Sequence, residues 1–148
     1  MPPRQSPMKM DKYSISTDKA RLDVAMIHRY LSTESYWALN IPREIVERSI
    51  ENSLCFGVYL ADAQVGFARV ITDQATFAYL SDVFILPEHR GKGLSKQLMQ
   101  TISDWPTLQG LRRWMLATND AHALYAQFGF TTPDQPELLM QRKRGKPY

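Results

Sequence analysis

The sequence predicts a single domain of the α/β (α+β) class, in which helices flank a central sheet that is mostly antiparallel. Three β-rich runs in the middle of the chain, joined by short polar stretches, predict an antiparallel meander. Segments whose apolar residues have helical spacing precede and follow these runs. A length of 148 residues suits one domain, which we assign to residues 11–148.

The N-terminal part of the chain predicts one strand followed by two helices. Residues 1–10 contain three prolines and no continuous apolar run, so we expect them to be disordered. Residues 13–15 alternate as in a short strand, and apolar residues from 22 to 31 recur with the spacing of one helix face. Pro42 stands where a second helix can start.

The rest of the chain predicts the meander and two further helices. The three runs of the meander are residues 54–60, 64–71 and 76–86. A helix follows from Leu94 and is expected to bury its apolar face. A strand at 113–117, a helix at 121–128 that ends at a glycine, and a last strand at 138–142 complete the order β-α-α-β-β-β-α-β-α-β.

Composition limits the possible functions. The net charge is +3 and is partly local, because four basic residues gather between 142 and 146, where they form a solvated terminus. No basic face interleaved with aromatic residues is evident, so we expect no nucleic-acid partner. No segment approaches the ~20 apolar residues of a membrane helix, so we expect no membrane partner and a cytoplasmic location.

The potential metal ligands are sparse. Cys55 is the single cysteine, which excludes an intrachain disulfide. His28, His89 and His122 lack the close spacing of metal ligands. We therefore expect neither redox nor metal chemistry, and we assign no metal site.

The junction between the third run and the following helix has the pattern of an anion-binding loop. The first amides of a helix have no internal partners and carry the positive end of its dipole. Gly91 and Gly93 let the backbone approach a ligand, and Arg90 and Lys92 add positive charge. A phosphate site is one interpretation, and a simple strand-to-helix turn with solvated charges is the other.

This stretch resembles the signature of the GNAT N-acetyltransferase superfamily, whose pyrophosphate loop has the pattern Arg/Gln-x-x-Gly-x-Gly/Ala. Arg90 and Gly93 match that pattern, and Ser95 takes its third place. The resemblance implies a mixed sheet whose central strands splay apart at an acetyl-CoA site. A further short strand near Phe130 would complete the family's usual count.

A second segment supports the resemblance, because residues 121–130 are similar to the family pattern Asn-x-x-Ala-x-x-Leu-Tyr-x-x-x-Gly-Phe. The Asn of the pattern falls at Thr118, and Asn119 follows one place later. The resemblance implies that the cofactor-binding residues lie on the strand end, the loop and this second segment. They are Phe84, Ile85, Leu86, Arg90, Gly91, Lys92, Gly93, Leu94, Ser95 and Asn119.

Acetyl transfer to an amine needs a proton for the departing thiolate and a base for the amine. By resemblance Tyr125 is the general acid, although it could also simply pack in the core. Asp82, on the strand that leads to the loop, is the nearest base, although it could be a solvated or bulge residue and ordered water could serve instead. Backbone amides of the strand end could polarise the thioester carbonyl.

The acceptor side is expected at Tyr36, Trp37 and Tyr79. These aromatic residues could form the wall of an amine pocket, partly through cation–π attraction, or could seal the edge of the core.

The sequence therefore predicts an acetyl-CoA-dependent N-acetyltransferase that acts on a primary amine, either a small molecule or a peptide. The alternatives are a domain that binds acyl-CoA without transfer and a transferase for a different acyl group. The sequence leaves open whether the protein is a monomer or a homodimer.

Overall fold

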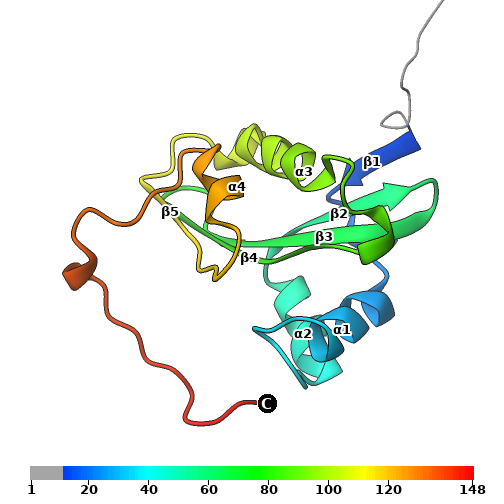
Figure 1. Ribbon diagram of the computed structural model, residues 1–148, viewed down its shortest axis with the longest axis horizontal. Helices are drawn as coiled ribbons and strands as arrows, with labels where there is room; N and C mark the ends of the chain where they lie inside the picture. Colours follow the sequence, from blue (N-terminus) through cyan, green and yellow to red (C-terminus); the bar gives the residue numbers. More distant parts are fainter. Residues whose placement is uncertain (1–11) are drawn as a thin grey trace, which may run out of the picture.

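The computed structural model describes residues 12–148 (Figure 1). The expected disorder of residues 1–10 therefore lies outside the described part of the chain. None of the helices in that part has the length and apolarity that a membrane crossing requires.

A five-stranded sheet in the order β1-β2-β3-β4-β5 forms the centre of the fold. The first four strands pair antiparallel, and β5 pairs parallel to β4, so the predicted meander and the mostly antiparallel sheet are confirmed. The strands are β1 (Tyr13–Ser16), β2 (Leu54–Leu60), β3 (Ala63–Thr72), β4 (Phe77–Ile85) and β5 (Arg113–Met115).

Helices cover both faces of the sheet (Figure 1). On one face lie α1 (Val24–Thr33) and α2 (Arg43–Glu51), and on the other lie α3 (Leu94–Ser103) and α4 (His122–Ala126). Each face has its own apolar core, because neighbouring strand residues point to opposite sides. Phe56 and Val58 of β2 contribute to the α3 side, whereas Cys55 contributes to the α1 side.

Local signals explain where the N-terminal helices begin. The Asp23 carboxylate accepts a hydrogen bond from the Met26 amide at 3.0 Å and so caps α1. Pro42 lies at the N-cap of α2 with an extended backbone, as its position in the sequence indicates.

The C-terminal part of the chain differs from the expected order. No strand forms at residues 138–142 or near Phe130, so these two expectations are wrong. Instead, a 3₁₀ turn occupies Pro136–Leu138, and every residue from 131 to 148 is exposed. Pro133 and Pro136 lack amide donors and fix their own φ angles, which works against a tight return to the sheet.

The pairing of β4 with its two neighbours is unequal, and this shapes the functional site. Its ladder with β3 runs from Ala78 to Ile85. Its ladder with β5 has three pairs only, which end at Tyr79 and Met115. Beyond these pairs the two strands separate, and the edge of β4 that faced β5 has no strand partner over residues 80–85. The splayed strands implied by the family resemblance are therefore present.

Candidate active site

The opening between β4 and β5 contains a cavity of about 400 Å³, which we call the central cavity. Four segments form its walls: the loop between α1 and α2, the middle of β4, the chain that follows β5, and α4. The lining residues are Tyr36, Trp37, Tyr79, Leu80, Ser81, Asp82, Val83, Leu116, Ala117, Thr118, Asn119, Asp120, Ala121 and Tyr125. The residues predicted as general acid, general base and acceptor wall therefore lie around one cavity.

Asp82 lies at a bulge of β4. Phe84 pairs with Phe67 and Ser81 pairs with Arg69, so β4 has one more residue than β3 across this interval. The φ angle of Asp82 is 53°, in the left-handed region that non-glycine residues rarely adopt. Such strained positions persist where surrounding contacts hold them, and they are frequent at functional sites.

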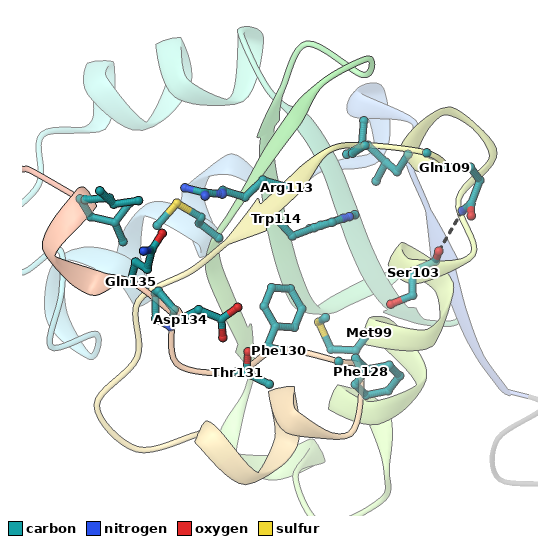
Figure 2. Close-up of a pocket in the computed structure, with 18 residues that line it drawn as sticks. Met99, Ser103, Gln109, Arg113, Trp114, Phe128, Phe130, Thr131, Asp134 and Gln135 are labelled. Carbon is teal, nitrogen blue, oxygen red and sulfur yellow. Dashed lines mark hydrogen bonds between the residues drawn. The ribbon is translucent and has the colours of Figure 1, made fainter.

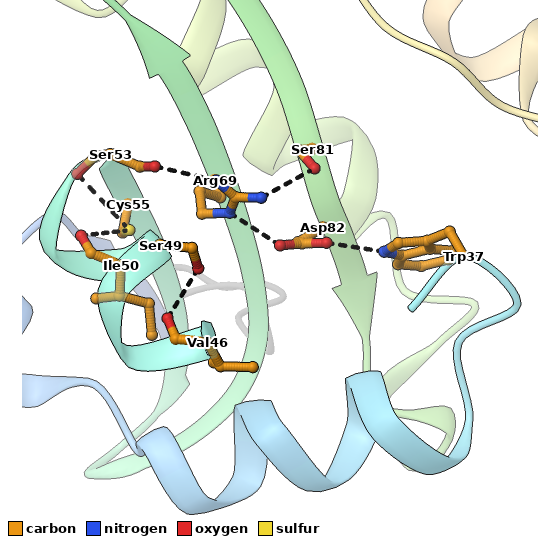
Figure 3. A network of polar contacts seen from close by, with 9 residues as sticks. All are labelled: Trp37, Val46, Ser49, Ile50, Ser53, Cys55, Arg69, Ser81 and Asp82. Carbon is orange, nitrogen blue, oxygen red and sulfur yellow. Dashed lines mark hydrogen bonds and ion pairs between the residues drawn. The ribbon is translucent and has the colours of Figure 1, made fainter. Parts of the chain in front are cut away.

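Two side chains hold the Asp82 carboxylate, and each donates a hydrogen bond to a different oxygen (Figure 3). The Arg69 Nε donates to Oδ2 at 2.9 Å, and the indole N–H of Trp37 donates to Oδ1 at 2.8 Å. The side chains of Arg69 and Asp82 are 15% and 9% exposed, so this ion pair is largely shielded from water. Arg69 also reaches the hydroxyls of Ser53 and Ser81, at 3.1 and 3.4 Å.

Arg69 is a site residue that the sequence interpretation missed. It stands in β3 between residues that are fully buried. A single arginine within such an apolar run indicates a buried anionic partner, because a buried charge must be paired. That signal could have revealed the ion pair, although it does not identify the partner.

The loop between α1 and α2 presents its aromatic residues through a compact turn. The buried Ser35 hydroxyl donates to the Leu31 carbonyl at 2.7 Å and accepts from the Ala38 amide at 3.0 Å. This turn leaves Tyr36 and Trp37 at the surface, with their rings in edge contact at 4.9 Å between centroids. Both residues line the central cavity.

Asn119 lines the central cavity, where its backbone amide makes a hydrogen bond. Its amide donates to the Tyr36 hydroxyl at 3.1 Å, so the loop after β5 is tied to the loop between α1 and α2. Thr118, which takes the place of the family's Asn, accepts from the Ala121 amide at 3.1 Å and so supports the turn into α4.

Tyr125 is 8% exposed and lies where α4 meets the central cavity. Burial raises the pKa of its phenol to about 12, with smaller contributions in the same direction from Tyr36 and Asp120. Burial disfavours the charged phenolate. The phenol therefore keeps its proton throughout the physiological range, as a proton donor must.

The loop between β4 and α3 has the geometry expected of an anion site. Gly91 and Gly93 have φ angles of 78° and 79°, and an added Cβ would meet nothing within 4 Å at either position. The positive φ, rather than crowding, is therefore the reason for glycine here. Gly93 is the N-cap of α3 and no side chain caps that helix, so its first amides are available to a ligand.

A small cavity of about 120 Å³ lies at this loop, lined by Ile85, His89, Arg90, Gly91, Gly93, Leu94 and Ser95. Lys92, which is exposed, stands between the two glycines.

Arg90 makes contacts within the protein that the sequence did not indicate. Its Nε donates to the Ile85 carbonyl at 2.8 Å, and its Nη2 donates to the Tyr30 hydroxyl at 2.9 Å. The Tyr30 ring stacks on Phe84 with centroids 4.0 Å apart. Arg90 therefore connects the loop to the end of β4 and to α1.

The backbone of the predicted cofactor strand is partly occupied. The Leu86 amide donates to the Val65 carbonyl at 2.8 Å, and Arg90 takes the Ile85 carbonyl. The side chains of Phe84 and Leu86 pack on the α1 side of the sheet, whereas Ile85 packs on the α3 side.

A larger cavity, of about 660 Å³, is lined by none of the residues predicted for the site (Figure 2). We call it the C-terminal cavity. Its walls are the end of α3, the segment from Leu108 to Leu111, β5, and the chain from Phe128 to Leu139. It shares no lining residue with the central cavity. The sequence did not indicate it. Among residues 12–148, no group of three His, Cys, Asp or Glu side chains is placed to hold a metal ion.

Comparison with known proteins agrees with this geometry. The sequence model of the Acetyltransferase (GNAT) family matches residues 24–130. A protein of Gibberella zeae, named as a candidate acetyltransferase, is 36% identical over 137 residues, which cover 78% of this chain and 76% of that protein. The chain therefore belongs to the GNAT family of acetyltransferases, which places it among the acyltransferase enzymes.

Solved structures show the same fold. A crystal structure of a candidate GNAT acetyltransferase from Xanthomonas campestris pv. campestris has a TM-score of 0.87 and 56% identity, covering 88% of this chain and 92% of that one. An acetyltransferase-like protein of Clostridium acetobutylicum, solved with acetyl-CoA, has a TM-score of 0.67 at 14% identity, covering 88% of this chain and 94% of that one.

The loop geometry predicts that CoA binding depends on Gly93. CoA should raise the melting temperature of the parent protein by mass action, and added salt should reduce the effect. Gly93→Asp places a carboxylate at the free amides of α3, so the stabilisation by CoA should disappear. Thermal melts with and without saturating CoA measure this.

Gly110→Asp is the matched control, because Gly110 also has a positive φ, of 75°, and open space around a Cβ. It introduces the same strain and charge away from the loop, so its response to CoA should equal that of the parent. An unchanged melting temperature of the parent protein at saturating CoA would overturn the loop assignment.

Proposed function

We propose that this protein transfers an acetyl group from acetyl-CoA to a primary amine. The observation that supports this most is the central cavity, which collects Tyr125, Asp82 and the three aromatic residues in the opening between β4 and β5. The loop between β4 and α3, which contains Gly91, Lys92 and Gly93 and which we call the anion loop, follows the end of the same strand β4. One strand thus leads from the proposed acceptor site to the proposed pyrophosphate site.

The cofactor site that we propose uses the loop and the unpaired edge of β4. Acetyl-CoA supplies an activated acetyl thioester and an anionic pyrophosphate. The free amides of α3, the two left-handed glycines and Lys92 suit the anion. The edge of β4 beyond Tyr79 can bind the amides of the pantetheine arm as a further strand would.

The reaction forms a bond between the amine nitrogen and the acetyl carbon and breaks the bond between that carbon and sulfur. Tyr125 donates its phenolic proton to the departing thiolate. The nitrogen enters as an ammonium group and loses two protons, one to the base before it attacks and one after the attack. Both pass to solvent, and Tyr125 recovers one proton from solvent. The products are an N-acetyl amine, free CoA and one proton, so protons and charges balance.

Asp82 is the base in this proposal. Arg69 and Trp37 each use one lone pair of its carboxylate, and each oxygen has a second that can accept from the amine or from an ordered water. The negative charge also attracts an ammonium group into the cavity. Arg69 and Trp37 act as positioning residues, because they hold the carboxylate at the bulge.

The acceptor wall in this proposal consists of Tyr36, Trp37 and Tyr79. Their aromatic faces can attract an ammonium group by cation–π interaction. The cavity of about 400 Å³ is of the size that holds a small molecule or a single side chain. The acceptor is therefore a compact primary amine, either free or at the end of an extended peptide side chain.

Two assays separate this function from its rivals. Release of free thiol when acetyl-CoA is mixed with a panel of amines distinguishes transfer from binding alone. Mass spectrometry of the CoA species that remain bound after purification distinguishes acetyl from other acyl groups.

Tyr125→Phe tests the general acid. The change keeps the buried ring and removes only the proton donor, so folding and acetyl-CoA affinity should persist. Turnover should fall by ~10²–10⁴-fold, the usual contribution of general acid catalysis. Because the phenol has a raised pKa, the parent rate should show no decline from its ionisation below about pH 11.

Tyr59→Phe is the matched control. Tyr59 is buried outside the central cavity and its hydroxyl has no partner in the described structure, so turnover should not change. If Tyr125→Phe kept turnover within a few-fold of the parent, Tyr125 would be a packing residue.

Asp82→Asn tests the base. The amide retains an acceptor for the Trp37 N–H but loses the charge and the proton affinity of the carboxylate. The kcat should fall ~10²-fold or more, on the scale of general base catalysis. Asp62→Asn, in the exposed turn between β2 and β3, is the control and should match the parent. A parent-like kcat for Asp82→Asn would assign deprotonation to water.

Two substitutions of Trp37 separate its two contacts. Trp37→Ala removes the aromatic wall and should raise the KM for amine far more than the KM for acetyl-CoA. Trp37→Phe keeps an aromatic face but removes the hydrogen bond to Asp82, so it should lower kcat with little change in the KM for amine. Equal effects of Trp37→Ala on both KM values, or lost stability with normal kinetics, would contradict the acceptor assignment.

A further inference from the structure

We propose that Tyr30 of α1 is a positioning residue of the proposed pyrophosphate site, where its hydroxyl holds the Arg90 guanidinium in place for an anion without neutralising its charge. The ligand class is a phosphate or diphosphate group. The inference rests on the proposed function, because it concerns the anion loop at which acetyl-CoA is proposed to bind. The sequence indicated only that Tyr30 belongs to the apolar face of a helix.

The Arg90 guanidinium has two acceptors within the protein, and both are uncharged. Its Nη2 donates to the Tyr30 hydroxyl at 2.9 Å, and its Nε donates to the Ile85 carbonyl at 2.8 Å. Among residues 12–148, Arg90 forms no ion pair with a carboxylate. The charge of Arg69, in contrast, is paired with Asp82. Arg90 is therefore held in place while its positive charge stays uncompensated.

An uncharged acceptor suits an anion site better than a carboxylate does. A carboxylate beside Arg90 would offset its charge and repel a phosphate, whereas a phenol oxygen accepts a hydrogen bond and carries no full charge. The Nη1 group of Arg90 takes no part in the contacts with Tyr30 and Ile85. Because Arg90 lines the small cavity at the anion loop, Nη1 is the part of the guanidinium that is left for a phosphate oxygen.

Tyr30 is a rigid partner for a side chain that is flexible by itself. Tyr30 is 7% exposed, and its ring stacks on Phe84 with centroids 4.0 Å apart and planes 9° from parallel. Arg90 is exposed, and a long exposed side chain loses many rotamers when it is fixed by a ligand. The contact with Tyr30 restricts Arg90 before the anion binds, and such preorganisation increases affinity.

The packing of α1 on the sheet brings Tyr30 to the anion loop. Tyr30 lies in the same apolar core as Phe84 and Leu86 from the end of β4, although it is 60 residues from Arg90 in the chain. A tyrosine combines a ring that packs in such a core with a hydroxyl that can bond at its edge. Phenylalanine could supply the packing alone, so the hydroxyl is the group that the proposal concerns.

Titration of CoA into Tyr30→Phe tests the proposal. The variant keeps the ring on Phe84 and removes only the hydroxyl, so its melting temperature without ligand should stay close to that of the parent. Its Kd for CoA, measured by calorimetry at fixed salt, should rise about tenfold, the factor of one hydrogen bond to a charged group. An unchanged Kd in the folded variant would overturn the proposal.

Tyr59→Phe is the matched control. Tyr59 is also buried, and its hydroxyl has no partner in the described structure, so this variant should bind CoA as the parent does. An equal rise of Kd in both variants would contradict a specific role of Tyr30. If the parent bound no CoA, the proposed function would fail together with this inference. Binding by the parent with no loss in Tyr30→Phe would remove the inference alone.

A double-mutant cycle tests whether Tyr30 acts through Arg90. Arg90→Met removes the guanidinium and keeps an unbranched side chain, so it should weaken CoA binding by itself. Adding Tyr30→Phe to Arg90→Met should cause no further loss, because no guanidinium is left for the phenol to hold. Equal losses in the two backgrounds would show that Tyr30 acts independently of Arg90 and would contradict the positioning role.

Steady-state kinetics separate an effect at the anion loop from damage to the central cavity. With an amine that the thiol-release assay identifies as an acceptor, Tyr30→Phe should raise the KM for acetyl-CoA. The kcat and the KM for amine should stay within about twofold of the parent values, because the hydroxyl contacts neither the amine nor the reacting atoms. A fall in kcat at an unchanged KM for acetyl-CoA would overturn the proposal.

Discussion

The site depends on the unequal pairing of β4 with its two neighbours. Its ladder with β3 continues almost to the loop between β4 and α3, whereas its ladder with β5 ends after three pairs. Backbone N–H and C=O groups beyond the end of a ladder must bond to other protein groups, to solvent or to a ligand. The separation of these strands therefore creates both the central cavity and an unpaired strand edge beside it.

The bulge at Asp82 places a carboxylate in the wall of the central cavity. One extra residue in β4 turns the carboxylate toward Arg69 and Trp37, two residues that come from different layers of the fold. The ion pair is mostly buried, and removing one partner of such a pair leaves the other charge without compensation. The position of the Asp82 carboxylate thus depends on β4, on the neighbouring strand β3 and on the loop between α1 and α2.

The two edge strands of the sheet, β1 and β5, also differ in how fully they are paired. β1 is paired to β2 along its length, whereas β5 is short and open, with a cavity and an exposed apolar segment close by. The same early end of the β4–β5 ladder that opens the central cavity keeps β5 short. One feature of the sheet thus shapes both the central cavity and the open edge of β5.

Much of the fold follows from local pattern. The spacing of apolar residues, the capping Asp23 and the glycines of the loop act within a few residues, so the meander, the helices and the loop were predictable. Two motifs in order were enough to identify the family. The strand expected at 138–142 was wrong, because β-propensity states only that a segment can pair, and whether a partner strand lies within reach depends on the tertiary structure.

The sequence by itself determined the order of the strands and helices as far as α4, the family and the loop between β4 and α3. These depend on short-range spacing and on glycines that permit a positive φ. Only the tertiary structure decided which side chains meet. The contacts of Asp82 with Arg69 and Trp37, of Tyr36 with the Asn119 amide, and of Arg90 with Tyr30 join residues far apart in the chain. Such contacts depend on strand register and on the bulge, which the packing of the whole sheet fixes and no local pattern encodes.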